Sequence, residues 1–460
     1  MVLVSLINPI FENMGQPPLG LAYIGAYLER FNIKVRIIDT SFEDLNNILK
    51  GNPRIVGIYS MTPYFNSLVH TIQFIKNHIT DAIVVVGGPH ASVQPFEVLN
   101  IPGVDYVVIG EGEVAFLELV QALTENGNVD QVKGIGFIRE KRIHITPPNP
   151  PIEDLDKLPF PARHLLPIEK YMRPFTLQEF NFLPIRATTM IASRGCVFNC
   201  VFCQPTLRKI FGVKTRYRSP ENVLDEMKLL KEEYGAEGIL FVDDTFTLNR
   251  EWVKMFCKKN NLGLKLAINS RIDTVDESML QEMKKAGVIS ILFGIESGNQ
   301  RILNNLRKGI TISQIENTVR KTKKVGFFVK GYFMIGAPGD TKETISQTIS
   351  FAKTLPLDQV QFSIATPYPG TELYEMAVRN GWIENLEGMK TMGYFKSAVM
   401  RTDSLSSNQI KSIHKVQCKP LVIEKQIISC CKRIPKILTK PSYIPHLFLQ
   451  GRKLIKYLTS

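Results

Sequence analysis

The sequence has 460 residues, which is enough for two or three domains with a large buried core. No apolar run reaches the roughly 18 residues of a membrane-spanning helix, so the sequence argues against an integral membrane protein. Of the net charge of +13, residues 401–460 carry +10, from twelve Lys or Arg against Asp403 and Glu424. We therefore expect an electrostatic partner to meet this tail.

The first part of the chain alternates short apolar stretches with helical patterns. Strands are predicted at 2–7, 35–39, 55–59, 83–86 and 106–109, and helices at 19–30, 65–79 and 113–124. Strands that alternate with helices are typical of a doubly wound parallel sheet, whose ligand lies beyond the carboxyl ends of the strands. Residues 1–7 lack a basic leader and a small-residue cleavage site, so we expect a first strand there and no signal peptide.

Turn residues follow several of these strands at the edge where a ligand is expected. They are Ser60-Met61-Thr62-Pro63 after the third strand, Gly87-Gly88-Pro89-His90 after the fourth, and Gly110-Glu111-Gly112-Glu113 after the fifth. Glycines at strand ends let the backbone approach a large flat or anionic ligand closely. From these residues alone, a generic nucleotide-binding domain and a sheet without a ligand both stay open.

A hairpin and a linker close this first part. Residues 133–145 predict a terminal hairpin, and the eight prolines between 147 and 174 then predict an extended linker over 146–185, because proline blocks both helices and central strands. We interpret the stretch from Asp156 to Arg163 as a plain spacer, and the alternative, which this stretch resembles, is a specific connector between the two domains.

A second series of strands and helices begins near residue 186. Strands are predicted at 186–192, 238–242, 265–269, 290–294, 328–335 and 359–364, and the helices between them start near Pro220, Arg250, Asp276, Ser313 and Lys342. In such a series the chemistry lies at the carboxyl ends of the strands.

Three cysteines, Cys196, Cys200 and Cys203, follow the first strand of this series. Thiolates this close in a tight loop can converge on one soft metal centre, whereas they rarely meet disulfide geometry. A four-iron cubane held by three thiolates keeps one iron free for a substrate or cofactor. The apolar strand before the loop, with Phe198 and Phe202, would keep the cluster from bulk water. The alternatives are unrelated cysteines or a zinc site that lacks a ligand.

The spacing of these cysteines resembles the signature of the radical S-adenosylmethionine superfamily. The stretch 17–24 and the two glycine turns, placed before it, resemble the N-terminal domain of the cobalamin-binding members. The resemblance implies a flavodoxin-like cobalamin-binding domain over 1–145, a partial (βα)6 barrel over 186–390 and a small helical basic C-terminal region over 391–460. It implies three cofactors, namely a [4Fe-4S] cluster, S-adenosylmethionine and cobalamin.

Within this resemblance, six residues are expected to contact cobalamin: Ser60, Thr62, Gly87, Gly88, His90 and Glu111. The Asp-x-His-x-x-Gly motif that supplies a cobalt ligand in methionine-synthase-like proteins is absent, because Asp39 is followed by Thr-Ser-Phe. We expect His90 to be a hydrogen-bonding residue and not a cobalt ligand. Cobalamin is then expected with its own base displaced, and the loop from Ser60 to Pro63 nearest its lower face.

Six further residues are candidates for S-adenosylmethionine binding: Asp244, Asn269, Arg271, Glu296, Gly336 and Gly339. Asp244 would bind the ribose, the amino group or the substrate, or else cap the next helix. Arg271 would clamp a carboxylate or phosphate, or else pair with Asp273 or Glu296. Asp340 replaces the glutamate of a family motif, and Asp340 or Thr341 is expected to cap the following helix.

The remaining candidates are weaker. Tyr368 lines the substrate cavity or simply packs. Cys257 is expected to be a core residue, and Cys418, Cys430 and Cys431 to be ordinary thiols, because they lack the spacing of a second cluster.

The resemblance implies that a 5′-deoxyadenosyl radical takes a hydrogen from an unactivated carbon, which then receives a methyl group from cobalamin. Ring formation or oxygenation is the runner-up, because the chain also resembles the anaerobic magnesium-protoporphyrin ester cyclase group. A hypothesis of another class is a carrier or sensor of cobalamin and the cluster without catalysis.

The predicted partners are a small-molecule or lipid substrate, and reduced ferredoxin or flavodoxin as the electron donor. Cysteine usage fits a reducing cytoplasm. Residues 421–438 and 443–458 are mixed apolar and basic stretches, and the final one either lies on an anionic membrane surface or forms a basic helical cap over the barrel mouth. Nucleic acid is not expected, because few aromatics interleave with these charges.

Overall fold

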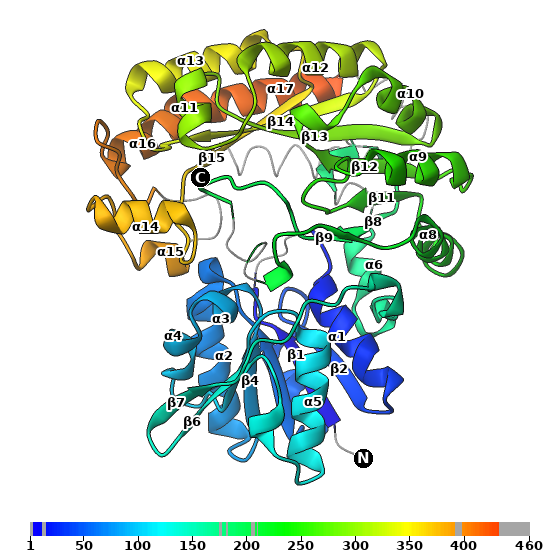
Figure 1. Ribbon diagram of the computed structural model, residues 1–460, viewed down its shortest axis with the longest axis vertical. Helices are drawn as coiled ribbons and strands as arrows, with labels where there is room; N and C mark the ends of the chain where they lie inside the picture. Colours follow the sequence, from blue (N-terminus) through cyan, green and yellow to red (C-terminus); the bar gives the residue numbers. More distant parts are fainter. Residues whose placement is uncertain are drawn as a thin grey trace.

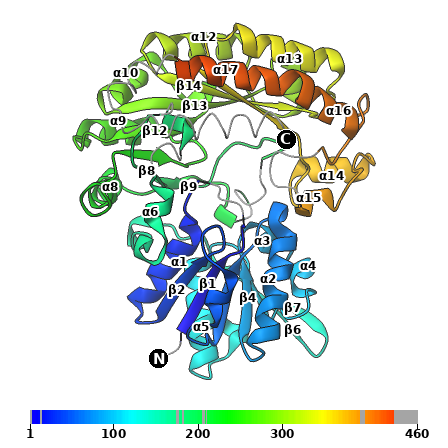
Figure 2. The same ribbon diagram turned by 180° about the vertical axis from the view of Figure 1, so that it is seen from behind.

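The computed structural model describes residues 3–11, 15–173, 177–180, 183–203, 208, 210–391 and 398–431, and the fold is given for these residues. Two α/β domains lie one above the other, the N-terminal one below and the C-terminal one above (Figure 1). The view from behind shows the same two bodies joined near α6 (Ile168–Tyr171) and β9 (Ser193–Arg194) (Figure 2). No helix in the described ranges is both long and apolar enough to cross a membrane.

The N-terminal domain contains a seven-stranded sheet of order β2-β1-β3-β4-β5-β6-β7. Its strands are β1 (Leu3–Asn8), β2 (Lys34–Asp39), β3 (Ile55–Tyr59), β4 (Ile83–Gly87), β5 (Tyr106–Val108), β6 (Ile135–Arg139) and β7 (Arg142–Ile145). The first five strands are parallel, and β6 and β7 form the predicted antiparallel hairpin. The order 2-1-3-4-5 is that of flavodoxin-like folds, so the predicted fold class of this domain is confirmed.

Helices cover both faces of this sheet because its strands are apolar on both sides. Val4 and Leu6 of β1 pack in one cluster with α1 (Leu19–Arg30) and α5 (Gly112–Thr124). Ile7 packs in the other cluster with α2 (Phe65–His78) and the short helices α3 (Pro89–Val93) and α4 (Pro95–Leu99). The polar turn residues are therefore left at the carboxyl edge of the sheet.

The C-terminal domain contains six parallel strands in sequential order. They are β8 (Ala187–Met190), β11 (Gly238–Phe241), β12 (Lys265–Ser270), β13 (Val288–Glu296), β14 (Phe328–Ile335) and β15 (Gln359–Ile364). The outer helices are α8 (Pro220–Tyr234), α9 (Arg250–Lys259), α10 (Glu277–Lys285), α11 (Gln300–Asn305), α12 (Ile312–Lys324) and α13 (Lys342–Thr354). Since β8 and β15 form the two edges of this sheet, it is the open partial barrel that the sequence predicts.

The segment between the domains packs tightly, so the interpretation of Asp156 to Arg163 as a plain spacer is wrong. Arg163 is 2% exposed and its guanidinium lies 2.9 Å from the Glu226 carboxylate on α8. Ala162 donates its backbone N–H to Ala22 of α1. The phenol of Tyr171 donates to Asp39 at the end of β2. This segment therefore fixes the two domains to each other.

The C-terminal region follows β15 with α14 (Glu372–Arg379), α15 (Gly388–Thr391), α16 (Ser407–Ile413), a π-helical turn (His414–Cys418) and α17 (Lys419–Cys431). Leu421 and Val422 of α17 are buried in the barrel's outer core, and Figure 1 shows this helix in the outer layer with α12 and α13. The alternatives predicted for the final stretch, a membrane contact or a cap over the barrel mouth, do not concern α17 and stay predictions. The side chains of Cys430 and Cys431 and all of residues 432–460, which include the predicted stretch 443–458, lie outside the described part.

Candidate functional site

A cavity of about 400 Å³ lies between the two domains. From the first domain it is lined by residues of α1, of strands β1, β3, β4 and β5, and of the loops after β4 and β5, among them Tyr59, Gly87, Gly88, Gly110 and Glu111. From the barrel it is lined by residues that follow β8 and β11, among them Ile191, Val242, Asp243 and Asp244. The carboxyl ends of both sheets therefore open onto one space.

The glycines of the first domain leave this cavity open. Gly20 and Gly110 line it, and a Cβ placed on either would have no atom within 4 Å. At Gly88, whose φ is +101°, a Cβ would lie 2.9 Å from the carbonyl oxygen of Ser60, so the turn admits no side chain. Together with the apolar lining, these residues fit a large flat ligand laid along the strand ends, as cobalamin requires.

Among the described residues, Ser60, Thr62 and His90 are not part of this lining. The Ser60 hydroxyl donates to the carbonyl of Gly87 at 2.8 Å and so holds the loop after β3 against β4. Thr62 Oγ1 lies 3.0 Å from His90 Nδ1, and Glu97 Oε2 lies 3.3 Å from His90 Nε2 without hydrogen-bond geometry. Burial lowers the pKa of His90. His90 is thus a hydrogen-bonding residue, as expected, and its contact with Thr62 holds the loop after β3 in place.

The three clustered cysteines lie in the loop that follows β9 and precedes β10 (Arg216–Tyr217). Cys196 is buried, whereas Cys200 and Cys203 are partly exposed. Burial raises the pKa of Cys196, and it raises that of Cys203 to about 12, with further contributions from the charges of Asp244 and the neighbouring thiols. Metal binding must therefore displace protons from these thiols. In the described ranges no three Cys, His, Asp or Glu side chains are already gathered as a metal site.

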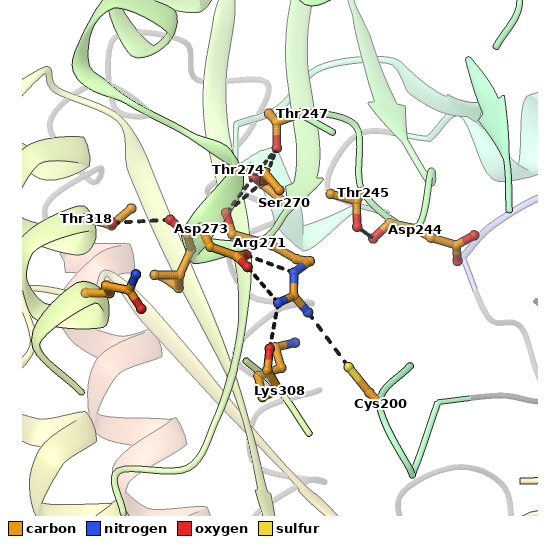
Figure 3. A network of polar contacts seen from close by, with 12 residues as sticks. Cys200, Asp244, Thr245, Thr247, Ser270, Arg271, Asp273, Thr274, Lys308 and Thr318 are labelled. Atoms are coloured by element: carbon orange, nitrogen blue, oxygen red, sulfur yellow. Dashed lines mark hydrogen bonds and ion pairs between the residues drawn. The ribbon is translucent and has the colours of Figure 1, made fainter. Parts of the chain in front are cut away.

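Arg271, directly after β12, reaches the cysteine loop (Figure 3). Its Nη1 donates to Cys200 Sγ at 3.7 Å, and its Nε and Nη2 donate to the two carboxylate oxygens of Asp273 at 2.9 Å each. Its guanidinium carbon lies 3.5 Å from the centre of the Phe198 ring. The alternative of an ion pair with Asp273 is therefore confirmed, and Arg271 contacts the cysteine loop itself.

Glu296 ends β13 in a left-handed conformation, with φ +71°, next to a register shift. Its carboxylate lies 2.8 Å from Lys308 Nζ, and both side chains are nearly buried. A Cβ on Gly294 would lie 2.8 Å from Glu296 Oε1 and 2.9 Å from Lys308 Nζ, so this glycine makes room for the pair. Glu296 thus faces the interior of the barrel near the cysteine loop, since Lys308 also lies 5.9 Å from the Phe202 ring.

Two adjacent carboxylates follow β11. Asp243 accepts from the Ser193 hydroxyl at 2.5 Å and from the backbone N–H of Ala192 at 3.1 Å, and burial raises its pKa to about 6. Asp244 opens onto the cavity, and the surrounding protein and the charge of Asp243 raise its pKa to about 7. The expectation that Asp244 caps the next helix is wrong, because Asn249 caps α9. Asp244 is therefore free to meet a ligand.

The other predicted residues have structural partners. Asn269 donates to the carbonyl of Phe241 at 3.4 Å. A Cβ on Gly336 would lie 3.1 Å from Ile410 of α16, and one on Gly339 would lie 2.6 Å from the Asn305 amide of α11, so these glycines let the two helices pack closely against the loop after β14. Thr341 caps α13, as one of the two expected alternatives. The cavity lining described above does not include Tyr368.

A buried ion-pair network crosses the domain interface, and the sequence did not predict it. Arg194, two residues before Cys196, lies 2.7 Å from Glu111 and 2.6 Å from Glu113 of the first domain. Arg216 lies 2.8 Å from the second oxygen of Glu111. Tyr23 of α1 lies under the Arg194 guanidinium at 5.1 Å. Glu111 is thus at the cavity, but its carboxylate ties the first domain to the cysteine loop.

Two family models match the chain in agreement with this arrangement. Residues 190–352 match the model described as "Radical SAM superfamily", and residues 15–120 match the "B12 binding domain". The matches fall on the half-barrel with its cysteine loop and on the flavodoxin-like domain. The chain belongs to the radical SAM superfamily, in the group whose members carry a B12 binding domain.

Known proteins narrow this class. An uncharacterized methyltransferase of Pyrococcus horikoshii is 36% identical over 98% of this chain and 95% of its own length. The anaerobic magnesium-protoporphyrin IX monomethyl ester cyclase of Rubrivivax gelatinosus is 30% identical over 81% of this chain and 69% of its own. The radical S-adenosylmethionine methyltransferase TsrM of Kitasatospora setae has the same fold, with a TM-score of 0.69 at 22% identity over 82% of this chain and 76% of its own.

The protein is accordingly an enzyme of the cobalamin-dependent radical SAM methyltransferase-like family. Membership confirms the predicted cofactors: the [4Fe-4S] cluster and S-adenosylmethionine for the barrel, and cobalamin for the first domain. The residues fit these groups, because the three free cysteines share one short loop directly after β9, and the cavity between the domains reaches Ser193 and Arg194 just before that loop.

Proposed function

We propose that this protein methylates an unactivated carbon of a small-molecule or lipid substrate. The observation that supports it most is the shared cavity, in which Gly88 and Gly110 of the first domain face Val242 and Asp244 of the barrel. When bound, the cluster supplies the electron that cleaves S-adenosylmethionine, and cobalamin supplies the methyl group. A substrate in this cavity would meet both cofactors without leaving the site.

The chain's own residues bind, orient and exclude water. Cys196, Cys200 and Cys203 would hold the cluster, and Glu296 and Asp244 would accept hydrogen bonds from the hydroxyl or amino groups of S-adenosylmethionine. The glycine turns after β4 and β5 would let a corrin ring lie close to the backbone. The buried network of Arg194, Glu111 and Glu113 would keep the two halves of the cavity closed to bulk water, which radical chemistry requires.

The test uses S-adenosylmethionine labelled in its methyl group, with extracts from a deletion strain as the source of substrate. One methylation would consume two S-adenosylmethionine molecules and two external electrons, and give the methylated product, 5′-deoxyadenosine, methionine and S-adenosylhomocysteine. Label in a product heavier by one methylene supports the proposal. An unlabelled cyclised product, with all methyl groups retained in methionine, would replace it with ring formation. No 5′-deoxyadenosine above background would favour a non-catalytic carrier.

We further propose that reduced ferredoxin or flavodoxin supplies these electrons in the cytoplasm. The partly exposed Cys200 and Cys203 are consistent with a donor that approaches the open side of the cluster loop. The predicted contact with a membrane would come from the final basic stretch, residues 443–458, which lies outside the described part. Liposome flotation with and without residues 432–460 tests it, and equal recovery in the bottom fraction would end this idea.

A further inference from the structure

The guanidinium of Arg271 is committed to the cysteine loop and its surroundings. Besides the bonds to Asp273 and Cys200, Nη2 donates to the backbone carbonyl of Lys308 at 2.6 Å. All three side-chain nitrogens of Arg271 therefore donate, in four hydrogen bonds, and the residue is only 5% exposed. Little of this side chain is left to clamp the carboxylate of an incoming ligand.

Two of these contacts fall on the loop that carries the cluster cysteines. Arg271 donates to Cys200 itself (Figure 3). It also stacks on Phe198, which lies between Cys196 and Cys200. Because Arg271 directly follows β12, the contacts fasten a loop without regular structure to a central strand of the barrel. A planar guanidinium suits both stacking and directed hydrogen bonds, and lysine could not replace both functions.

We propose that Arg271 is a positioning residue for the cluster and sets its reduction potential through Cys200, and that Asp273 moderates this effect. Hydrogen bonds to cluster sulfurs and the net charge nearby are the main protein controls on the potential of an iron–sulfur cluster. Reduction adds one negative charge, so a cation at Cys200 stabilises the reduced form and raises the potential. Asp273 places a negative charge on the same guanidinium and therefore acts in the opposite direction. This inference depends on ligation of the cluster by the three cysteines and not on methyl transfer.

The test is a redox titration of the anaerobically reconstituted cluster, followed by electron paramagnetic resonance, together with its iron content. A hydrogen bond to a charged group changes an equilibrium about tenfold. For Arg271→Gln we expect about tenfold less reduced cluster at a fixed potential, which is a shift of about 59 mV to more negative values for one electron. The reduction potential of Arg271→Lys should lie between those of this variant and the wild type, because lysine keeps the positive charge but lacks the planar guanidinium that stacks on Phe198.

Asp273→Asn should shift the potential in the opposite direction, to more positive values, because it removes the balancing negative charge. Arg250→Gln is the matched control, since Arg250 forms an exposed ion pair with Asp276 on the outside of the barrel. The inference is overturned if Arg271→Gln and Asp273→Asn shift the potential in the same direction, or if neither differs from the control. If Arg271→Gln does not retain iron, the Asp273→Asn variant alone tests the proposal. An unchanged or lowered reduction potential in Asp273→Asn contradicts it.

Discussion

Arg194→Met should destabilise the protein strongly, because it breaks the buried network at the domain interface. The side chains of Arg194, Glu111 and Glu113 are 7%, 4% and 5% exposed. Without Arg194, Glu111 keeps Arg216 at 2.8 Å and the backbone N–H of Ile152 at 2.8 Å. Glu113 keeps no other ion-pair partner in the described part of the chain.

The magnitude follows from the one carboxylate left unpaired. Removing one partner of a buried ion pair costs about 3–5 kcal/mol, and the lower half of that range applies here because Glu111 stays paired. With an m-value near 3 kcal/mol per M, the midpoint of urea unfolding should fall by about 1 M or slightly more. Circular dichroism of the protein in increasing urea measures this midpoint.

Two further variants test whether the loss of stability comes from the unpaired buried charge or from the substitution of an arginine in general. Arg194→Met combined with Glu113→Gln should recover most of the lost stability, because the unpaired charge is removed as well. Arg307→Gln, which breaks the exposed pair with Glu372, should leave the midpoint near the wild-type value. If Arg194→Met behaves like Arg307→Gln, or if the double variant is less stable than Arg194→Met alone, the reasoning about the buried network is refuted.

Three other predictions concern the cavity and the barrel. Gly20→Leu should weaken cobalamin binding at least tenfold in absorbance titrations without lowering the melting temperature, because leucine favours helix α1 while its side chain enters the open cavity. Gly88→Ala should lower both stability and cobalamin affinity, by about 1–3 kcal/mol in unfolding free energy, because φ is +101° and the Cβ meets the Ser60 carbonyl. Burial raises the pKa of Asp340 to about 6, so between about pH 4 and pH 6 the native state holds a proton that the unfolded chain has released. The wild type should therefore lose stability as the pH rises through this range. Asp340→Asn should lack this loss when urea unfolding is measured at several pH values. Unchanged cobalamin affinity in Gly20→Leu, a wild-type midpoint in Gly88→Ala, or equal pH profiles for Asp340→Asn and the wild type would contradict these predictions.

The elements with strong periodic patterns could be predicted from the sequence. The predicted helix 19–30 coincides with α1, and the predicted strands 55–59, 328–335 and 359–364 coincide with β3, β14 and β15. β13 runs two residues further at each end than predicted, because Gly294 leaves space for the Glu296–Lys308 pair and does not end the strand. Local patterns therefore locate the elements, while tertiary packing sets their ends.

The site was predictable only where its residues are close in sequence. The three cysteines and the glycine turns form compact motifs, so their types and spacing indicate their chemistry. Arg194 and Glu111 are 83 residues apart, and Arg163 and Glu226 are 63 apart, so nothing local marks them as partners. The same holds for Arg271, whose contact with Cys200 spans 71 residues and depends on how the loop lies against β12.

Iron content and electron paramagnetic resonance of the anaerobically reconstituted protein test the central claim most directly. If Cys196, Cys200 and Cys203 hold the cluster, the wild type and a Cys257→Ala control should carry about four irons per chain and a reducible signal. The variant with alanine at all three positions should carry neither. Retention of iron and signal by that triple variant would contradict the account.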